Sequence, residues 1–151
     1  MKKFFWAISI FLIIFAPARL SAQGLKELLV DCFNEALGLE NHIRQLSGEV
    51  VSSVDRPLHW KVSGDQNGLV LEKGGNLSVP GILWYQVSCP KSGLKFFWTP
   101  DRTFGKIFTP AGNFLLESRG GQFSLSLDPG IKKINKKTLK QCRKELKNFK
   151  Q

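Results

Sequence analysis

Residues 82–127 read ILWYQVSCPKSGLKFFWTPDRTFGKIFTPAGNFLLESRGGQFSLSL. Short runs rich in Ile, Leu, Val, Phe and Trp alternate in this stretch with Pro- and Gly-containing turns at close, regular intervals. Such spacing is typical of antiparallel strands joined by tight connections. Together with two similar runs upstream, the pattern predicts strands over residues 58–63, 69–72, 82–89, 94–99, 106–108, 114–118 and 123–127.

Helical periodicity flanks these strands on both sides. Between residues 24 and 46 the apolar side chains recur at i, i+3, i+4 and i+7, which predicts one buried stripe that Gly38 bends or ends. The same spacing returns in a C-terminal helix expected over residues 135–150, with Asn135 as its N-cap. The expected fold class is therefore α+β, an antiparallel meander sheet of about six or seven strands whose apolar face is covered by the N-terminal and C-terminal helices.

The first segment has the composition of an export signal. Residues 1–22 begin with lysines, continue in an apolar run over residues 4–15, and end in small side chains that predict cleavage before Gln23. A retained anchor is the alternative, although the run is shorter than the ~20 residues of a membrane-spanning helix. We expect a signal peptide over residues 1–22, a single domain over residues 23–151, and a periplasmic or secreted protein.

The positive charge is concentrated at the C-terminal end. The chain carries a formal net charge of +10, yet residues 23–128 hold ten basic and eleven acidic side chains. Residues 129–151 hold nine basic side chains and one acidic side chain, Glu145. Several of these lysines lie near a helix N-terminus, where the helix dipole disfavours cations, and few acids stand at i±4 to relieve their repulsion.

This charge has two interpretations. A lysine-rich helix face is commonly a solvated surface, but it also suits an anionic partner such as lipid head groups, lipopolysaccharide phosphates, acidic wall polymers or an acidic protein. Lysine outnumbers arginine, which disfavours sequence-specific reading of nucleic acid. The candidate binding residues on the helix are Lys136, Lys140, Arg143, Lys144 and Lys147.

Three cysteines in an oxidising compartment allow one disulfide and leave one thiol. Cys32 and Cys142 lie on the apolar stripes of the two helices, so their pairing is the first expectation. Cys89, at a strand end, gives the competing Cys89–Cys142 pair. No CxxC spacing is present for redox or zinc chemistry.

Large aromatic side chains fall on both faces of the predicted sheet, because alternate residues of a strand point to opposite sides. Trp84 and Trp98, on neighbouring strands, are the candidate aromatic binding residues; burial in the core is the competing interpretation for such rings.

Motifs for catalysis are weak. Ser88–Lys91 and Ser92–Lys95 match the S-x-x-K spacing of serine acyl-enzymes, but they fall in a predicted strand-turn-strand segment and not at a helix start. His42 and His59 are isolated. We therefore expect no catalytic residue, metal or cofactor.

Three functional hypotheses remain. The first is a small exported, non-enzymatic binding or interaction protein, such as an inhibitor or an envelope accessory factor, with a protein or an anionic envelope component as its partner. The second is a polyanion or envelope-surface binder that acts through the lysine-rich helix alone. The third is a small hydrolase or a thiol enzyme that uses Cys89.

Overall fold

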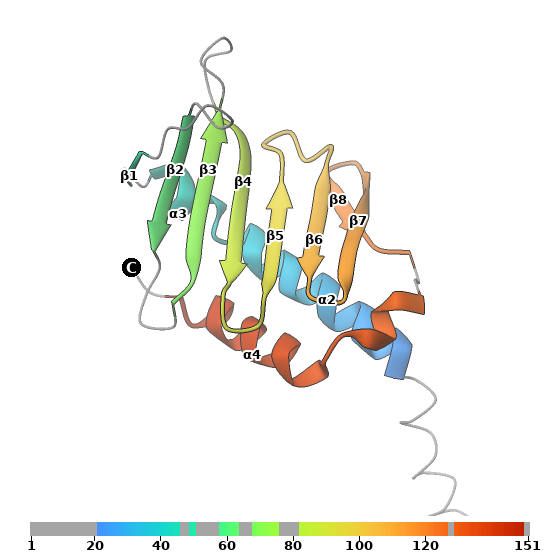
Figure 1. Ribbon diagram of the computed structural model, residues 1–151. Helices are drawn as coiled ribbons and strands as arrows, with labels where there is room; N and C mark the ends of the chain where they lie inside the picture. The colour runs from blue at the N-terminus through green and yellow to red at the C-terminus, as the bar shows by residue number, and fades with distance from the viewer. Residues whose placement is uncertain are drawn as a thin grey trace, which may run out of the picture.

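Eight antiparallel strands of the described residues follow one another across the sheet in chain order (Figure 1). Their bounds are β1 Glu49–Val50, β2 Leu58–Ser63, β3 Val70–Gly75, β4 Ile82–Cys89, β5 Leu94–Trp98, β6 Gly105–Thr109, β7 Gly112–Arg119 and β8 Gln122–Ser124. The computed structural model describes residues 21–45, 49–50, 58–63, 68–75, 82–126 and 129–149.

The predicted fold class is confirmed, and the seven predicted strands correspond to β2 through β8. β2 and β4 have the predicted bounds, and the two-residue strand β1 was not predicted. β8 ends at Ser124, earlier than expected. Residues 1–20 of the expected signal peptide lie outside the described residues.

Two helices form the N-terminal part of the described chain. α2 (Ser21–Leu37) ends at the predicted Gly38, where the amide of Gly38 bonds to the carbonyl of Asn34 over 3.2 Å. The short α3 (Glu40–Gln45) follows. No helix among the described residues is both long and apolar enough to cross a membrane.

The C-terminal part comprises a 3₁₀ turn, η1 (Pro129–Lys133), and α4 (Lys136–Lys147). Asn135 is the N-cap, as predicted, and its side-chain oxygen accepts a hydrogen bond from the amide of Lys137 over 2.9 Å. The helix ends at Lys147, three residues before the expected end, because Asn148 takes the C-cap position.

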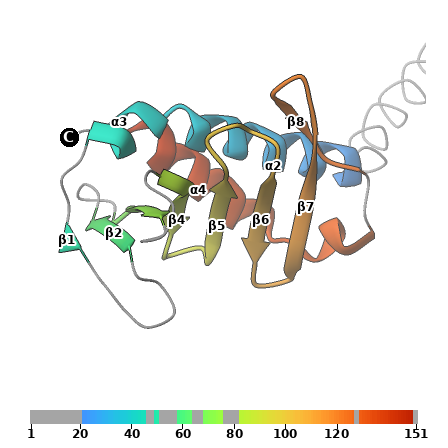
Figure 2. The same cartoon turned by 90° about the horizontal axis from the view of Figure 1, so that it is seen from above.

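In the described part of the chain, α2, α3 and α4 lie on one face of the sheet, and the opposite face carries no helix (Figure 2). β8 curls from the end of β7 toward α2 in the same view. The protein is therefore built in two layers, with the core between the sheet and the helices.

Strand alternation decides which side chains enter this core. Phe96 and Trp98 of β5 are fully buried, whereas Phe97 between them points to the open face and is half-buried. Phe33 of α2 is at the centre, with ring centroids 6.1 Å from those of both Phe96 and Trp98 and 5.1 Å from that of Phe123. Burial of each of these side chains stabilises the fold by about 1.5–3 kcal/mol.

The disulfide joins Cys89 to Cys142, so the alternative pairing is confirmed and the first expectation, Cys32–Cys142, is wrong. Cys32 is a buried free thiol whose Sγ lies 3.5 Å from the carbonyl oxygen of Leu139, which it contacts as a donor. Leu139 lies about one turn before Cys142 on α4. Cys32 therefore faces the preceding turn of α4, and Cys89 at the end of β4 bonds to Cys142 instead.

Candidate anion-binding face

The exposed side of α4 is an array of cations, which we call the lysine face: Lys136, Lys137, Lys140, Lys144 and Lys147. Because Leu139, Cys142 and Leu146 point into the core, helical spacing leaves these five lysines on the outer side. All five side chains are exposed. Four of the five helical residues proposed from the sequence therefore lie together on one surface.

The single acidic residue of α4 does not neutralise this face. Glu145 is only 2 % exposed and points inward, where its Oε1 accepts a hydrogen bond from Nε2 of Gln141 over 3.2 Å. Composition alone counts Glu145 against the lysines, but burial removes it from their surface. The exposed side of α4 therefore presents no carboxylate among the described residues.

Arg143, the fifth proposed helical residue, is different because it is half-buried and paired with α2. Its Nη1 lies 3.6 Å from Oδ2 of Asp31, and Nζ of Lys147 lies 4.0 Å from Oε1 of Glu35. Within the described residues, Lys136, Lys137, Lys140 and Lys144 have no acidic partner within salt-bridge distance.

The pairing of Asp31 and Glu35 with cations of α4 was not anticipated from the sequence. Their four-residue spacing matches that of Arg143 and Lys147, so two parallel stripes can meet when the helices lie side by side. That matched spacing was the available signal.

A shallow hollow of about 250 Å³ lies between α2 and α4, and we call it the basic hollow. Its lining residues are Leu28, Lys140, Arg143, Lys144, Lys147 and Asn148. Four of these six side chains are cationic. Leu28 and Asn148 were not proposed from the sequence.

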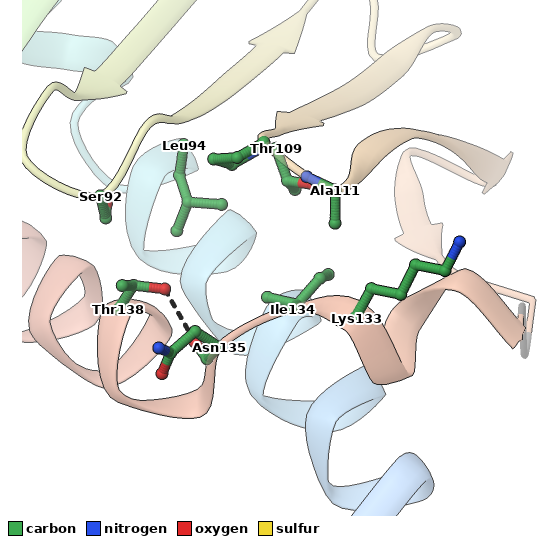
Figure 3. A pocket seen from close by; sticks show the side chains of 9 residues that line it. Ser92, Leu94, Thr109, Ala111, Lys133, Ile134, Asn135 and Thr138 are labelled. Carbon is green, nitrogen blue, oxygen red and sulfur yellow. Dashed lines mark hydrogen bonds between the residues drawn. The ribbon is translucent and has the colours of Figure 1, made fainter.

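A second pocket, of about 140 Å³, lies at the N-terminal end of α4 (Figure 3). Leu94 and Ile134 project toward each other across it, and the amine of Lys133 points away. The hydroxyl of Thr138 donates to the carbonyl of Asn135 over 2.7 Å, and that of Ser92 donates to the carbonyl of Cys89 over 3.2 Å. The walls are mainly apolar and these hydroxyls are already engaged, so the pocket lacks the features of an anion site.

The open face of the sheet carries three rings that we call the aromatic cluster: Trp84, Phe97 and Phe104. Trp84 stacks on Phe97 with centroids 5.7 Å apart, and Phe104 meets Phe97 edge-on at 5.9 Å. Phe104 is 40 % exposed. The indole of Trp84 covers Gly74, where an added Cβ would come within 2.2 Å of the ring.

Trp98 is not part of this surface, which corrects its assignment as a binding residue. It is fully buried on the helix side of the sheet, and its Nε1 donates to Oε1 of Glu40 over 3.4 Å. The even-numbered Trp84 on β4 faces outward, but the register pairs Trp98 with the inward-facing Tyr85. The two tryptophans therefore belong to opposite faces.

The cysteines offer no nucleophile of the expected kind. Cys89 is bonded to Cys142 and so carries no free thiol in this structure, whereas the thiol-enzyme hypothesis requires one at this position. Burial raises the pKa of the Cys32 thiol to about 12, although the positive charge of Arg143 acts to lower it. Cys32 is therefore a protonated core residue at neutral pH.

Other candidate groups for chemistry are dispersed. His42 packs against Phe149 with ring centroids 5.6 Å apart, and the side chain of His59 lies outside the described residues. Ser88 is buried at the end of β4, in the strand context expected from the sequence. Among the described residues, no group of His, Cys, Asp and Glu is arranged to hold a metal ion.

Comparison with protein-family models, with curated proteins and with solved structures finds no match.

Proposed function

We propose that this chain is an exported, non-enzymatic binding protein that contacts an anionic component of the cell envelope through the lysine face. The observation that carries the proposal is the unpaired state of Lys136, Lys137, Lys140 and Lys144 within the described residues, combined with the burial of Glu145. Export is part of the proposal: the predicted signal segment and the Cys89–Cys142 disulfide support an oxidising compartment.

The arrangement has an energetic cost in the free protein. Lys136–Lys140 and Lys140–Lys144 are like-charged i,i+4 pairs, each of which destabilises a helix by about 0.2–0.5 kcal/mol. Lys136 and Lys137 also lie in the first turn, where each cation costs about 0.3–1 kcal/mol against the helix dipole. A bound polyanion removes both penalties, whereas solvent only screens them.

The helix is well supported as a contact surface. Its inner side is buried against the sheet and α2, and its second turn is bonded covalently to β4 through Cys142. Because α4 is already ordered, binding through its lysines does not require folding of the helix, and less conformational entropy is lost.

The test compares vesicles of phosphatidylglycerol with vesicles of phosphatidylcholine, using protein recovered from its export compartment. We expect binding to the anionic vesicles only, with an affinity that falls as NaCl rises. Changing Lys136, Lys137, Lys140 and Lys144 to Gln should remove about 1 kcal/mol of binding per lysine.

A matched control changes four cations outside α4, Lys91, Lys95, Lys106 and Arg119, to Gln. This variant loses the same formal charge but keeps the lysine face, so its affinity should change much less. Equal losses in the two variants would mean that net charge alone drives binding, and the proposal would be wrong.

A second candidate function is protein binding through the aromatic cluster. It is favoured by the partial exposure of three contacting rings and of Leu115, which is 62 % exposed, on a face without a helix in the described residues. Changing Phe104 to Ser should abolish such an interaction and leave vesicle binding unchanged. The lysine face is preferred because its unpaired charge also specifies the chemistry of the partner.

A further inference from the structure

We infer that the basic hollow between α2 and α4 is a binding site for a phosphate monoester carried by the envelope ligand. This inference rests on the proposed function and deepens it, since it assigns one part of the lysine face to a defined chemical group. The hollow is lined by Lys140, Arg143, Lys144 and Lys147, with Leu28 and Asn148 completing its wall.

The charge balance of the hollow matches a dianion. Asp31 and Glu35 pair with Arg143 and Lys147 but do not line the hollow. Two of the four lining cations are therefore compensated, and the positive charge of Lys140 and Lys144 remains in excess. A phosphate monoester carries a charge of about −1.5 to −2 at pH 7.

The same ion pairs position the groups that would contact the ligand. Arg143 is held by Asp31 at 3.6 Å and is half-buried, so its guanidinium is more restricted than an exposed lysine amine. A planar guanidinium flanked by point-like ammonium groups is a favourable arrangement of donors for phosphate oxygens. Lys140 and Lys144 are the groups free to adjust to the ligand.

The size and the wall indicate what carries the phosphate. A volume of about 250 Å³ accommodates a phosphate with a few attached atoms, but not an extended chain. Leu28 provides apolar contact for the carbon adjacent to the ester oxygen, and no aromatic side chain among the described residues lines the hollow for stacking on a base. Glycerol phosphate and phosphorylated sugars have this chemistry.

The hollow also divides the lysine face into two unequal parts. Lys140 and Lys144 line it, whereas Lys136 and Lys137, on the preceding turn, do not. On a uniformly charged surface, the two pairs of lysines would contribute equally to the binding of an anion. A phosphate site would depend on Lys140 and Lys144 far more than on Lys136 and Lys137.

The experiment uses this difference between two charge-matched double variants, Lys140→Gln with Lys144→Gln and Lys136→Gln with Lys137→Gln. Both remove two exposed cations from α4, and equal melting temperatures establish that both fold. Binding of glycerol 3-phosphate and of inorganic phosphate is measured by calorimetry. Binding to phosphatidic acid vesicles, diluted in phosphatidylcholine, is measured by sedimentation.

We expect saturable binding of glycerol 3-phosphate that weakens about tenfold or more in the Lys140/Lys144 variant and less than about threefold in the Lys136/Lys137 variant. Tighter binding of phosphatidic acid than of soluble glycerol 3-phosphate identifies a lipid as the source, and the reverse order identifies a soluble or polymer-borne ester. Either order of the two affinities would support the phosphate site in the basic hollow.

Equal weakening of glycerol 3-phosphate binding in the two variants would overturn the phosphate site and leave the proposed function standing. Absence of binding to every phosphate monoester would also overturn the site, with phosphatidylglycerol binding as the separate readout of the proposed function. If neither variant changed any binding, both the site and the proposed function would be wrong.

Discussion

Cys89, the last residue of β4, is bonded to Cys142 in α4, with the two Cα atoms 5.7 Å apart. The bond connects the sheet to the helix that carries the lysine face, and 53 positions separate its ends in the sequence. It holds the middle of α4 in place while the outer side of the helix stays exposed.

Loss of this disulfide should destabilise the protein substantially. Closure of a loop of this length contributes about 4 kcal/mol in the chain-entropy model, so changing Cys89 and Cys142 to Ala should lower the free energy of unfolding by up to that amount. Urea unfolding measures the change. The Cys32→Ala variant is the control, because a reductant should still destabilise it; a wild-type protein insensitive to reductant would contradict the assignment.

Thiol labelling should identify Cys32 as the free cysteine. Because the side chain is buried and its pKa is raised to about 12, native protein should not react with iodoacetamide at pH 8. Unfolding without reduction should allow modification of Cys32 alone, which peptide mass spectrometry detects. Modification of Cys89 under these conditions would disprove the pairing.

The same thiol should give stability a defined dependence on alkaline pH. In the unfolded chain Cys32 ionises near its ordinary pKa of 9.0, but in the folded protein it stays protonated to about pH 12. Between these values the unfolded state binds fewer protons, so the contribution of Cys32 is complete below pH 9 and decreases as pH rises. The slope is about 1.4 kcal/mol per pH unit.

Urea titrations at pH 8, 9, 10 and 11 test this dependence. The difference in unfolding free energy between wild type and Cys32→Ala should shrink with rising pH. Taking this difference removes the contribution of lysine titration, which is common to both proteins. A difference that stayed constant over this range would contradict the buried, protonated thiol.

Glu40 should be among the polar side chains most important for stability. Its Oε2 accepts from Nη2 of Arg102 at 2.9 Å, its Oε1 accepts from Nε1 of Trp98 at 3.4 Å, and the carboxylate is largely buried. Glu40→Gln leaves one of these donors facing an amide NH₂, so we expect a loss of about 1–3 kcal/mol in chemical denaturation.

Asp31→Asn is the matched control for Glu40→Gln, since it breaks a partly exposed ion pair with Arg143 at 3.6 Å. Its cost should stay below about 1 kcal/mol. If the two substitutions had equal effects, the buried network around Glu40 would be unimportant for the fold.

Much of the fold was predictable because it depends on local patterns. Alternation and turn residues gave the bounds of β4, and the side-chain oxygen of Asn135 caps α4 as its position indicated. Gly38 ends α2 for the same local reason. These features are set by neighbours in the sequence, so no tertiary information was needed.

Features that depend on how elements meet were not predictable. The apolar stripe placed Cys32 toward α4 but did not specify which turn it would face, and that decided the disulfide. Strand alternation assigned the aromatic side chains to two faces of the sheet. It did not indicate whether the face of Trp84 or the face of Trp98 would be covered by the helices. Composition also counted Glu145 as a surface charge, although the packing of α4 buries it.

The most direct test of the central claim is lysine acetylation footprinting on phosphatidylglycerol vesicles, read by mass spectrometry residue by residue. Lys136, Lys137, Lys140 and Lys144 should be protected when vesicles are present, and high salt should remove the protection. Lys91 and Lys95, on the β4–β5 turn and β5, should react equally with and without vesicles. Protection of Lys91 and Lys95, or equal protection of all lysines, would contradict binding through the lysine face.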